Sequence, residues 1–535
     1  MKTVTPRDGD IRLLLTSNGM PGTLNNLTDD EASDYEESLP AFTGAQYGKP
    51  AISKRVSSLC MSLAQSLGHW GFCLLKALSP SFTHHLWMQR PSTTGTAGSV
   101  SRDGHRPILF LDGIRGVACL VVFNFHFLYP HTYTIFQNFG APTPDGQHDF
   151  FHQLPYVCLI YRGRAMVVLF FALSGYVLSY RYLSQIRHHA WEGSQKSIAS
   201  LTLRRFVRLY VPPTTSMFLV MVAAFFGAFE PGRRFQDSDW RHGPAEQHPV
   251  QQATILAQLS DFARMWWDWS NPWTWNPYFS HYDPHTWTIP LEFRSSIALF
   301  ALLVSRTRLR VFYGFALTLV VALYCLFSAR WDVAVFLGGS LVADVHIALS
   351  SRQAGVVTLS PTTIRGVARK SYQEIPKTLV TRLGLLLGLY LLSFPDEASE
   401  VTPGYKTMAS WTPSNYGHKY LFWHCIACII LLWCSGLDEI IKRPFETKVA
   451  QYLGKISYAL YLVHGPLLHS LGFALQPRIW ERIGHESTSQ WILGLFVGWM
   501  LMLGWSIVVA DLFWRCIDAA LVSFTKQIEQ AISIR

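Results

Sequence analysis

Apolar stretches of about 20 residues recur along most of this 535-residue chain. A helix rises about 1.5 Å per residue, so each stretch is long enough to cross the roughly 30 Å hydrocarbon core of a bilayer. Only 15% of the residues are charged, whereas a soluble domain usually carries about 25%. The sequence therefore predicts an all-α fold, a polytopic membrane bundle of about ten transmembrane helices.

Ten candidate spans set the expected topology. They lie at about 108–129, 164–182, 209–229, 286–304, 311–329, 331–349, 379–395, 418–440, 453–474 and 490–514. An even number of spans places both termini on the same side of the membrane.

Loop charge indicates which side that is. One set of alternate loops carries 19 Lys and Arg against three acids, and the other carries 10 against 15. The positive-inside rule then places both termini in the cytosol. The membrane itself is expected to be that of the endoplasmic reticulum or the plasma membrane. The net charge of +10 is explained by these loops, so no nucleic-acid partner is expected. The long loop 230–285 on the outer side is rich in Trp and either caps a cavity or lies on the interface.

The segments outside the spans carry fewer signals. Residues 1–100 are expected to be a largely disordered cytosolic region, with a possible interfacial helix near 56–78. The transmembrane domain is expected to cover about 101–520, and 521–535 to form a short cytosolic tail. Cys425 and Cys428 have C-x-x-C spacing but lie inside a span, so no metal site is predicted.

The first span carries two ionisable residues where charge is expensive. Arg115 and His126 are 11 residues apart, which is about three helical turns plus 20°. They therefore share one helix face, about 16 Å apart along the axis. Such a face offers a fixed cation and a titratable base. The alternative is structural, with Arg115 paired to Asp112 and His126 bonded to a neighbouring helix.

Other spans add polar groups at similar depths. Glu292 follows Pro290 at the start of the fourth span, where an unpaired carboxylate is costly, and is expected to meet a partner such as His126. Tyr461 and His464 share a face of the ninth span, although packing also explains the tyrosine. Ser174 lies in the second span, where small residues commonly permit close helix packing.

Arg205 and Arg208 stand at the cytosolic start of the third span. Much of this charge reflects the positive-inside rule. Guanidinium groups also bind phosphate well, so the pair offers a place for a phosphate-bearing cofactor.

These segments together resemble the acyltransferase-3 family of integral membrane acyltransferases, in particular its fungal members. The resemblance covers about residues 107–515. It rests on Leu111-Asp112-Gly113-Ile114-Arg115-Gly116 followed by His126, on Phe170-Phe171-x-Leu173-Ser174-Gly175-Tyr176, on Arg205-x-x-Arg208, on Trp287-Thr288-x-x-x-Glu292, and on Ile456-Ser457-Tyr458-x-Leu460-Tyr461-Leu462-x-His464. Five motifs in the family's order form a specific signal.

The resemblance implies transfer of an acyl group, often acetyl, from acyl-CoA to a hydroxyl of a small molecule such as a secondary metabolite or a carbohydrate. Acyl-CoA is then a co-substrate, and no permanently bound cofactor is expected. His126 is the expected base, Glu292 its orienting partner, and Arg115 the third catalytic residue. The expected substrate-binding and acyl-CoA-binding residues are Arg205, Arg208, Ser174, Tyr461 and His464.

Two other classes of protein remain. A proton-coupled membrane transporter would use His126 and Glu292 as a proton relay, but the inverted repeats typical of such carriers are not evident. A membrane scaffold without enzymatic activity would not require Arg115 and His126 on one helix face.

Overall fold

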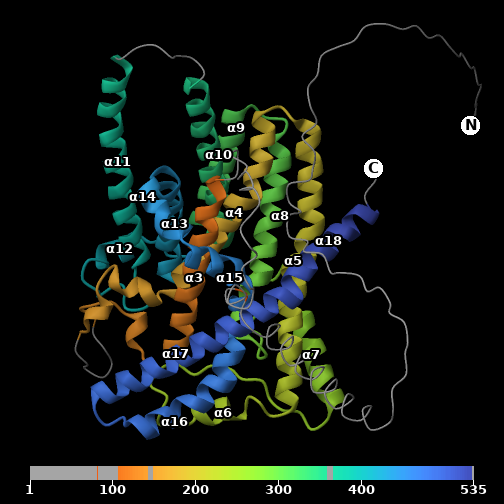
Figure 1. The fold of residues 1–535 in the computed structure, drawn as a ribbon, viewed down its shortest axis with the longest axis vertical. Helices are drawn as coiled ribbons and strands as arrows, with labels where there is room; N and C mark the ends of the chain where they lie inside the picture. The colour runs from red at the N-terminus through yellow and green to blue at the C-terminus, as the bar shows by residue number, and fades with distance from the viewer. Residues whose placement is uncertain (1–80, 82–105, 142–148, 358–364, 533–535) are drawn as a thin grey trace, which may run out of the picture. The chain divides into compact units, whose positions relative to one another are not determined.

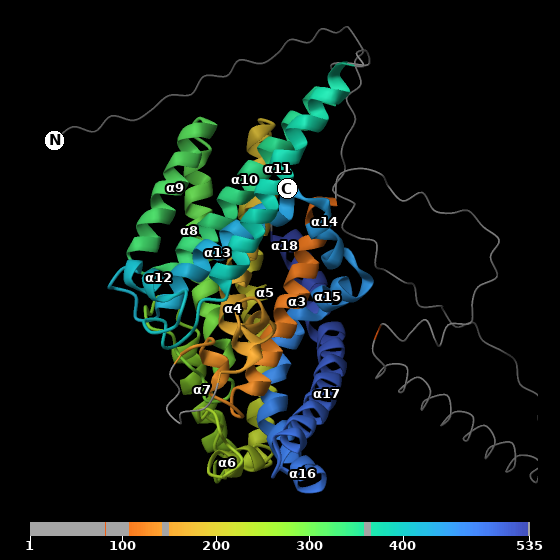
Figure 2. The same ribbon diagram turned by 90° about the vertical axis from the view of Figure 1, so that its left-hand side faces the viewer.

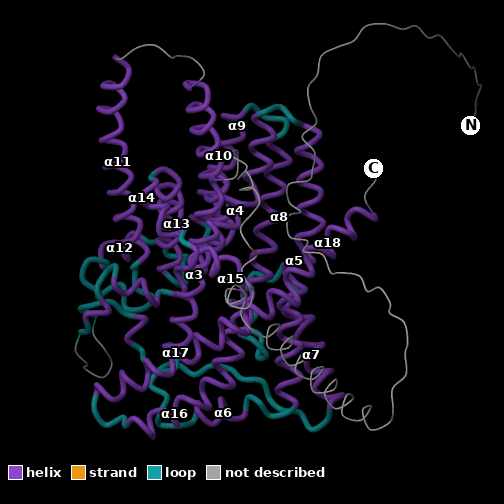
Figure 3. Tube along the Cα trace, in the orientation of Figure 1, coloured by secondary structure: helices purple, strands orange, loops and turns teal. Residues whose placement is uncertain are grey.

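The computed structural model describes residue 81 and residues 106–141, 149–357 and 365–532 (Figure 1). The N-terminal region, including the interfacial helix expected near 56–78, lies outside the described residues. In the described ranges the fold is all-α, with helices joined by loops and no strand (Figure 3). This confirms the predicted fold class.

The described chain forms the following longer helices and short connecting ones. They are α3 (Arg106–Leu128), α4 (Gly163–Arg187), α5 (Trp191–Phe225), α6 (Glu230–Gln236), α7 (Ile255–Trp269), α8 (Thr288–Arg306), α9 (Val311–Phe327), α10 (Trp331–Val357), α11 (Arg365–Leu392), α12 (Lys406–Trp411), α13 (Lys419–Leu437), α14 (Glu439–Lys442), α15 (Lys448–Leu467), α16 (Phe473–Ile483), α17 (Thr488–Phe513) and α18 (Ala519–Ile532). Two turns of π-helix, Leu468–Gly472 and Trp514–Asp518, follow α15 and α17.

Every expected span overlaps a helix, but the helices differ in length and in apolar character. Within the described residues, seven helices are long and apolar enough to cross a membrane. Two further apolar helices, Val311–Phe327 and Thr378–Leu392, are shorter. The protein is therefore a polytopic membrane bundle, and the count of ten spans stays a prediction.

Several helices continue beyond the apolar stretches. The segment 181–208, expected to be a loop, is almost entirely helical because α4 runs to Arg187 and α5 begins at Trp191. Its polar residues support a helix, as in the exposed Lys196–Glu192 pair at i, i+4 with 2.8 Å between Nζ and Oε1. Hydropathy marks where a helix is apolar and gives no signal for where it ends. The expected tail is likewise helical, as α18.

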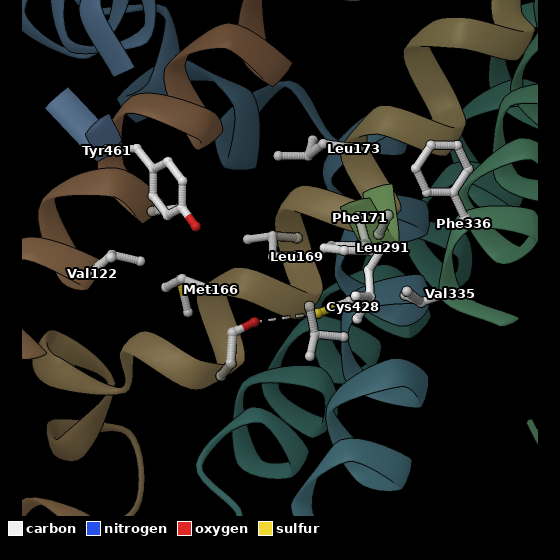
Figure 4. Close-up of a cluster of buried hydrophobic side chains, with 14 of the residues drawn as sticks. Val122, Met166, Leu169, Phe171, Leu173, Leu291, Val335, Phe336, Cys428 and Tyr461 are labelled. Carbon is white, nitrogen blue, oxygen red and sulfur yellow. Dashed lines mark hydrogen bonds between the residues drawn. The ribbon is translucent and has the colours of Figure 1, made fainter. Parts of the chain in front are cut away.

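The core lies where α3, α4, α8, α10, α13 and α15 meet (Figures 2 and 4). Large side chains such as Phe171 and Phe336 are fully buried there. The cysteines of the C-x-x-C pair are buried in α13 and bind backbone, with Cys428 Sγ donating to the Ala165 carbonyl and Cys425 Sγ to that of Trp331.

Helices α3 and α15 cross at very short range. A Cβ atom on Gly116 would stand 2.4 Å from the backbone nitrogen of Gly454, and one on Gly454 would stand 2.2 Å from the carbonyl oxygen of Asp112. Only glycine permits this approach on both helices. The crossing brings the polar faces of the two helices together.

Some intramembrane charges tie helices to one another. Asp344 on α10 accepts from Arg187 on α4, at 2.6 Å, and from Arg306 on α8. Asp332 at the start of α10 accepts from Arg294 at 2.5 Å and from Arg330 at 3.2 Å. Arg294 is thus paired with Asp332 and not with Glu292, its neighbour two residues earlier on α8. Each buried carboxylate has cationic partners, which burial requires.

Candidate active site

Three imidazoles meet where the C-terminal ends of α3 and α15 approach the 3-10 helix Pro284–Trp287, which precedes α8. The ring of His126 lies 3.9 Å from that of His285 and 5.2 Å from that of His464, measured between centroids. The rings of His285 and His464 are 5.1 Å apart. His285 and His464 are buried, at 5% and 1% exposure. The first span thus meets a histidine from each of two distant segments.

The far nitrogens of two of these rings are held by hydrogen bonds. His285 Nδ1 lies 2.9 Å from Asp283 Oδ1, and His464 Nδ1 lies 3.0 Å from the carbonyl oxygen of Leu460. Because a carboxylate and a carbonyl only accept, each Nδ1 carries the proton. The Nε2 atoms of both rings, and Nδ1 of His126, are buried without a hydrogen-bond partner in the described structure.

Asp283 is held by the local fold. It caps the short 3-10 helix Pro284–Trp287, accepting from the backbone nitrogen of His285 at 3.1 Å, and Pro284 follows at the first helical position. Aspartate at the cap and proline after it are favourable at a helix start. The same carboxylate oxygen therefore begins the helix and orients the imidazole.

A buried carboxylate adjoins the imidazoles. Glu246, from the loop after α6, lies 2.8 Å from His469 Nε2 and 3.8 Å from His285 Nε2. Burial raises the pKa of the Glu246 carboxyl, but His469, His285 and His248 together lower it by more. The pKa of Glu246 therefore lies below its ordinary value. His248 stacks on His469 at 4.5 Å.

Tyr461 connects these imidazoles to the middle of the bundle. Its hydroxyl lies 2.7 Å from Thr288 Oγ1 and also donates to the carbonyl of His285. The ring points toward the apolar core drawn in Figure 4. Tyr461 and His464 do share one face of α15, as the sequence predicted.

Glu292 lies elsewhere than expected. Its carboxylate accepts from Ser174 Oγ at 2.7 Å and from Arg205 at 2.8 Å, and no contact with His126 occurs among the described residues. The expectation that Glu292 orients His126 is therefore corrected. Seven residues separate it from His285, about 10 Å along the helix at 1.5 Å per residue, so it lies deeper than the imidazoles.

Arginines gather at the opposite end of the same helix pair. Arg115 binds Asp112 at 3.0 Å and also donates to Ser457 Oγ and to the Gly454 carbonyl of α15, each at 3.0 Å. Arg115 and His126 thus both face α15, and the Asp112 pair of the alternative interpretation forms as well. Arg208 lies within electrostatic range of Arg115, Arg204 and Arg205, so the predicted arginines share one region.

The Trp-rich loop lines a separate cleft. The segment Trp267–Tyr278 lines a cavity of about 840 Å³. Trp275 is held between Arg294 and Arg330, whose guanidinium carbons lie 4.8 and 4.2 Å from its ring centroid. Trp267, Trp273 and Trp275 are all more than 60% exposed. The two arginines thus hold Trp275 in place at the cleft, while the three tryptophan side chains remain exposed.

Some site residues escaped sequence reasoning. His285 and Asp283 carried a usable signal, because Asp-Pro marks the start of a helix and places the following histidine at its first turn. Glu246 and His469 carried none, since they come from a loop and a π-turn brought together by packing. Two sets of these side chains, His126 with His285 and His464, and Glu246 with His285 and His469, place their ligand atoms within 4.8 Å of one another, a spacing that a metal ion can also use. The sequence analysis predicted neither of these two sets.

The fold and site together define a multi-pass membrane protein with buried imidazoles at one end of a helix pair and arginines at the other. A family model described as an acyltransferase domain matches residues 108–515. The chain therefore belongs to the acyltransferase-3 family of membrane acyltransferases.

Curated fungal relatives agree with the family. O-acetyltransferase PaAT-1 of Phomopsis amygdali is 30% identical over 83% of this chain and 88% of its own length. Acyltransferase clz18 of Cochliobolus lunatus is 26% identical over 81% of this chain and 99% of its own. Acyltransferase R4 of a Phoma species is 24% identical over 76% and 93% respectively. No solved structure matches the chain.

Proposed function

We propose that this protein transfers an acyl group, acetyl in particular, from acyl-CoA to a hydroxyl of a small molecule such as a secondary metabolite or a carbohydrate. The observation that carries the proposal is the α3–α15 pair, which joins a basic end to a buried imidazole cluster. The printed name of the relative PaAT-1, an O-acetyltransferase, supports acetyl as the group and oxygen as the acceptor atom.

In this proposal the imidazoles act on the acceptor hydroxyl. A thioester is already activated, whereas a neutral hydroxyl is a poor nucleophile. The acceptor O–H loses its proton to His126 as the new C–O bond forms, the C–S bond breaks, and the departing thiolate takes up a proton. General-base assistance of this kind contributes about 10²–10⁴-fold. The open Nε2 of His464 lies beside His126 and binds a hydroxyl hydrogen of the acceptor.

The arginines bind the donor. Arg115, Arg205 and Arg208 present guanidinium forks that suit the phosphates of CoA. Glu292 and Ser174 serve as their supports, because the Glu292 carboxylate fixes Arg205 at 2.8 Å. Tyr461 lies between the two ends and, through Thr288 and the His285 carbonyl, keeps α8 and α15 in register.

The basic end faces the cytosol in this proposal. The alternate loops with excess Lys and Arg lie at that end, where α10 and α11 extend beyond the bundle (Figure 1). Acyl-CoA is a cytosolic metabolite, so donor supply and loop charge agree. Both termini are then cytosolic, and the imidazoles lie toward the outer side.

The test uses the purified full chain in nanodiscs with radiolabelled acetyl-CoA. Glucose, cyclohexanol and phenol serve as probe acceptors. Product formation should depend on both acetyl-CoA and acceptor. The variant His126→Ala should lose at least about 100-fold in turnover, while His281→Ala, at a partly exposed histidine that pairs with Asp261, should retain it. Transfer that survives in His126→Ala rejects the assignment of the base.

A further inference from the structure

The second imidazole of the cluster carries the features of an oriented base. Asp283 is 1% exposed and binds His285 Nδ1, which leaves the lone pair on His285 Nε2. The ring of His285 stands edge-on to His126 at 3.9 Å between centroids, with an interplanar angle of 80°. An aspartate behind one histidine nitrogen, with the other nitrogen directed at a reaction partner, is the arrangement that stabilises an imidazolium.

A count of hydrogens points the same way. His285 Nε2 and His464 Nε2 are both lone pairs, because each Nδ1 proton is used elsewhere. Neutral His126 has one N–H to offer two acceptors, and no hydrogen bond from another described residue reaches them. A buried acceptor that lacks a hydrogen-bond donor is costly. One additional proton on the cluster would supply a donor for the second acceptor.

We infer that His285 and Asp283 form a relay that takes the proton from His126 during acyl transfer and stabilises the resulting imidazolium. The inference rests on the proposed function and adds two positioning residues to it. The acceptor hydroxyl gives its proton to His126, His126 passes one proton to His285 Nε2, and the same proton returns through His126 to the departing thiolate. No bond other than N–H, O–H, C–O, C–S and S–H changes, and no redox partner is needed.

The charged neighbours of the cluster favour this direction of transfer. Asp283 from the loop before α8 and Glu246 from the loop after α6 both face His285, at 2.9 and 3.8 Å. His464 from α15 lies 5.2 Å from His126 between ring centroids, and His469 from the π-turn and Arg164 from α4 lie within electrostatic range of His126. Both carboxylates thus lie on the His285 side of the cluster, and the fixed cation lies on the His126 side.

The decisive variant is Asp283→Asn. Asparagine caps a helix as well as aspartate does, so the start of the 3-10 helix is preserved while the negative charge is lost. The matched control is Asp261→Asn, because Asp261 Oδ2 on α7 binds His281 Nε2 at the same 2.9 Å, away from the imidazole cluster and with side chains 28% and 32% exposed. A second variant, His285→Gln, removes the ring without altering Asp283.

Two readouts separate the relay from the proposed function. The first is turnover with acetyl-CoA as a function of pH, where Asp283→Asn should lower kcat by about 10²–10⁴-fold with the KM for acetyl-CoA unchanged. The second needs no activity: the rate at which diethyl pyrocarbonate modifies His126, followed by mass spectrometry from pH 5 to 8. In Asp283→Asn, the midpoint of this pH dependence should move about 1 unit or more to lower pH, because the carboxylate no longer stabilises the protonated form of the cluster. His285→Gln should also shift this midpoint. The control Asp261→Asn should leave both turnover and the midpoint unchanged.

Each outcome has one meaning. If the wild-type protein shows no transfer while Asp283→Asn still shifts the modification midpoint, the proposed function is refuted and the proton-sharing cluster is supported. An unshifted midpoint in both Asp283→Asn and His285→Gln overturns the relay, even if turnover falls. A stoichiometric transition metal found by mass spectrometry of the purified protein also overturns it, since the same nitrogens would then be ligands.

Discussion

The Glu292–Arg205 pair allows the energetics of the bundle to be tested directly. The two side chains are 17% and 16% exposed, and 2.8 Å separates Oε1 from the guanidinium nitrogen. At an effective dielectric constant of about 20, unit charges at that distance attract by about 6 kcal/mol. Desolvation of two ions costs several kcal/mol, so the pair as a whole contributes little net stability.

Breaking the pair has a different cost. Glu292→Gln leaves Arg205 as an uncompensated cation, and Arg205→Met does the same to Glu292, so each single variant should lose about 3–5 kcal/mol in free energy of unfolding. The double variant removes both charges and should lose no more than either single one. The expected coupling free energy is about 3 kcal/mol, at the upper end for residues in contact.

The assay is equilibrium unfolding of the purified protein by SDS in mixed micelles. The control is the Lys419–Glu400 pair, which has the same 2.8 Å separation but side chains 35% and 57% exposed. Its single variants, Lys419→Met and Glu400→Gln, should each cost less than about 1 kcal/mol. Additive effects of Glu292→Gln and Arg205→Met would refute the reasoning, because independent losses mean that the two charges do not compensate each other.

Three further predictions concern other parts of the bundle. Gly454→Val should separate α3 from α15, costing at least about 1–3 kcal/mol by overpacking and reducing turnover, whereas Gly504→Val, a site with nothing within 4 Å, should do neither; thermal unfolding and the transfer assay check this. Tyr461→Phe removes a hydroxyl with two partners and should cost about 1–3 kcal/mol; an unchanged melting temperature would contradict the role given to it. Burial and, secondly, His242 lower the pKa of His131 to about 3. The unfolded chain binds a proton near pH 6.5, so stability should be full above that pH and fall by about 1.4 kcal/mol per unit below it, toward about pH 3. His131→Phe should flatten this slope between pH 6.5 and 5 in unfolding experiments, and an unaltered slope would exclude His131 as its source.

The sequence by itself determined the class of fold and much of the helix inventory. Apolar length decides where a helix can cross a bilayer, and this property is local to each stretch. The placement of Arg115 and His126 on one face was also local, because an 11-residue separation fixes their angle on any α-helix. Both side chains do face α15 in the structure.

Tertiary structure alone decided which side chains meet. Glu292 was expected beside His126 because both enter from the outer side, but depth estimated from span ends cannot resolve two helical turns, and the carboxylate lies with Arg205 and Ser174 instead. The partner of His126 came from the next segment upstream, where a capping aspartate orients His285. Glu246 and His469 join them only because a loop and a π-turn pack against the end of the bundle that holds the imidazoles. Long-range packing of that kind leaves no periodic trace in a sequence.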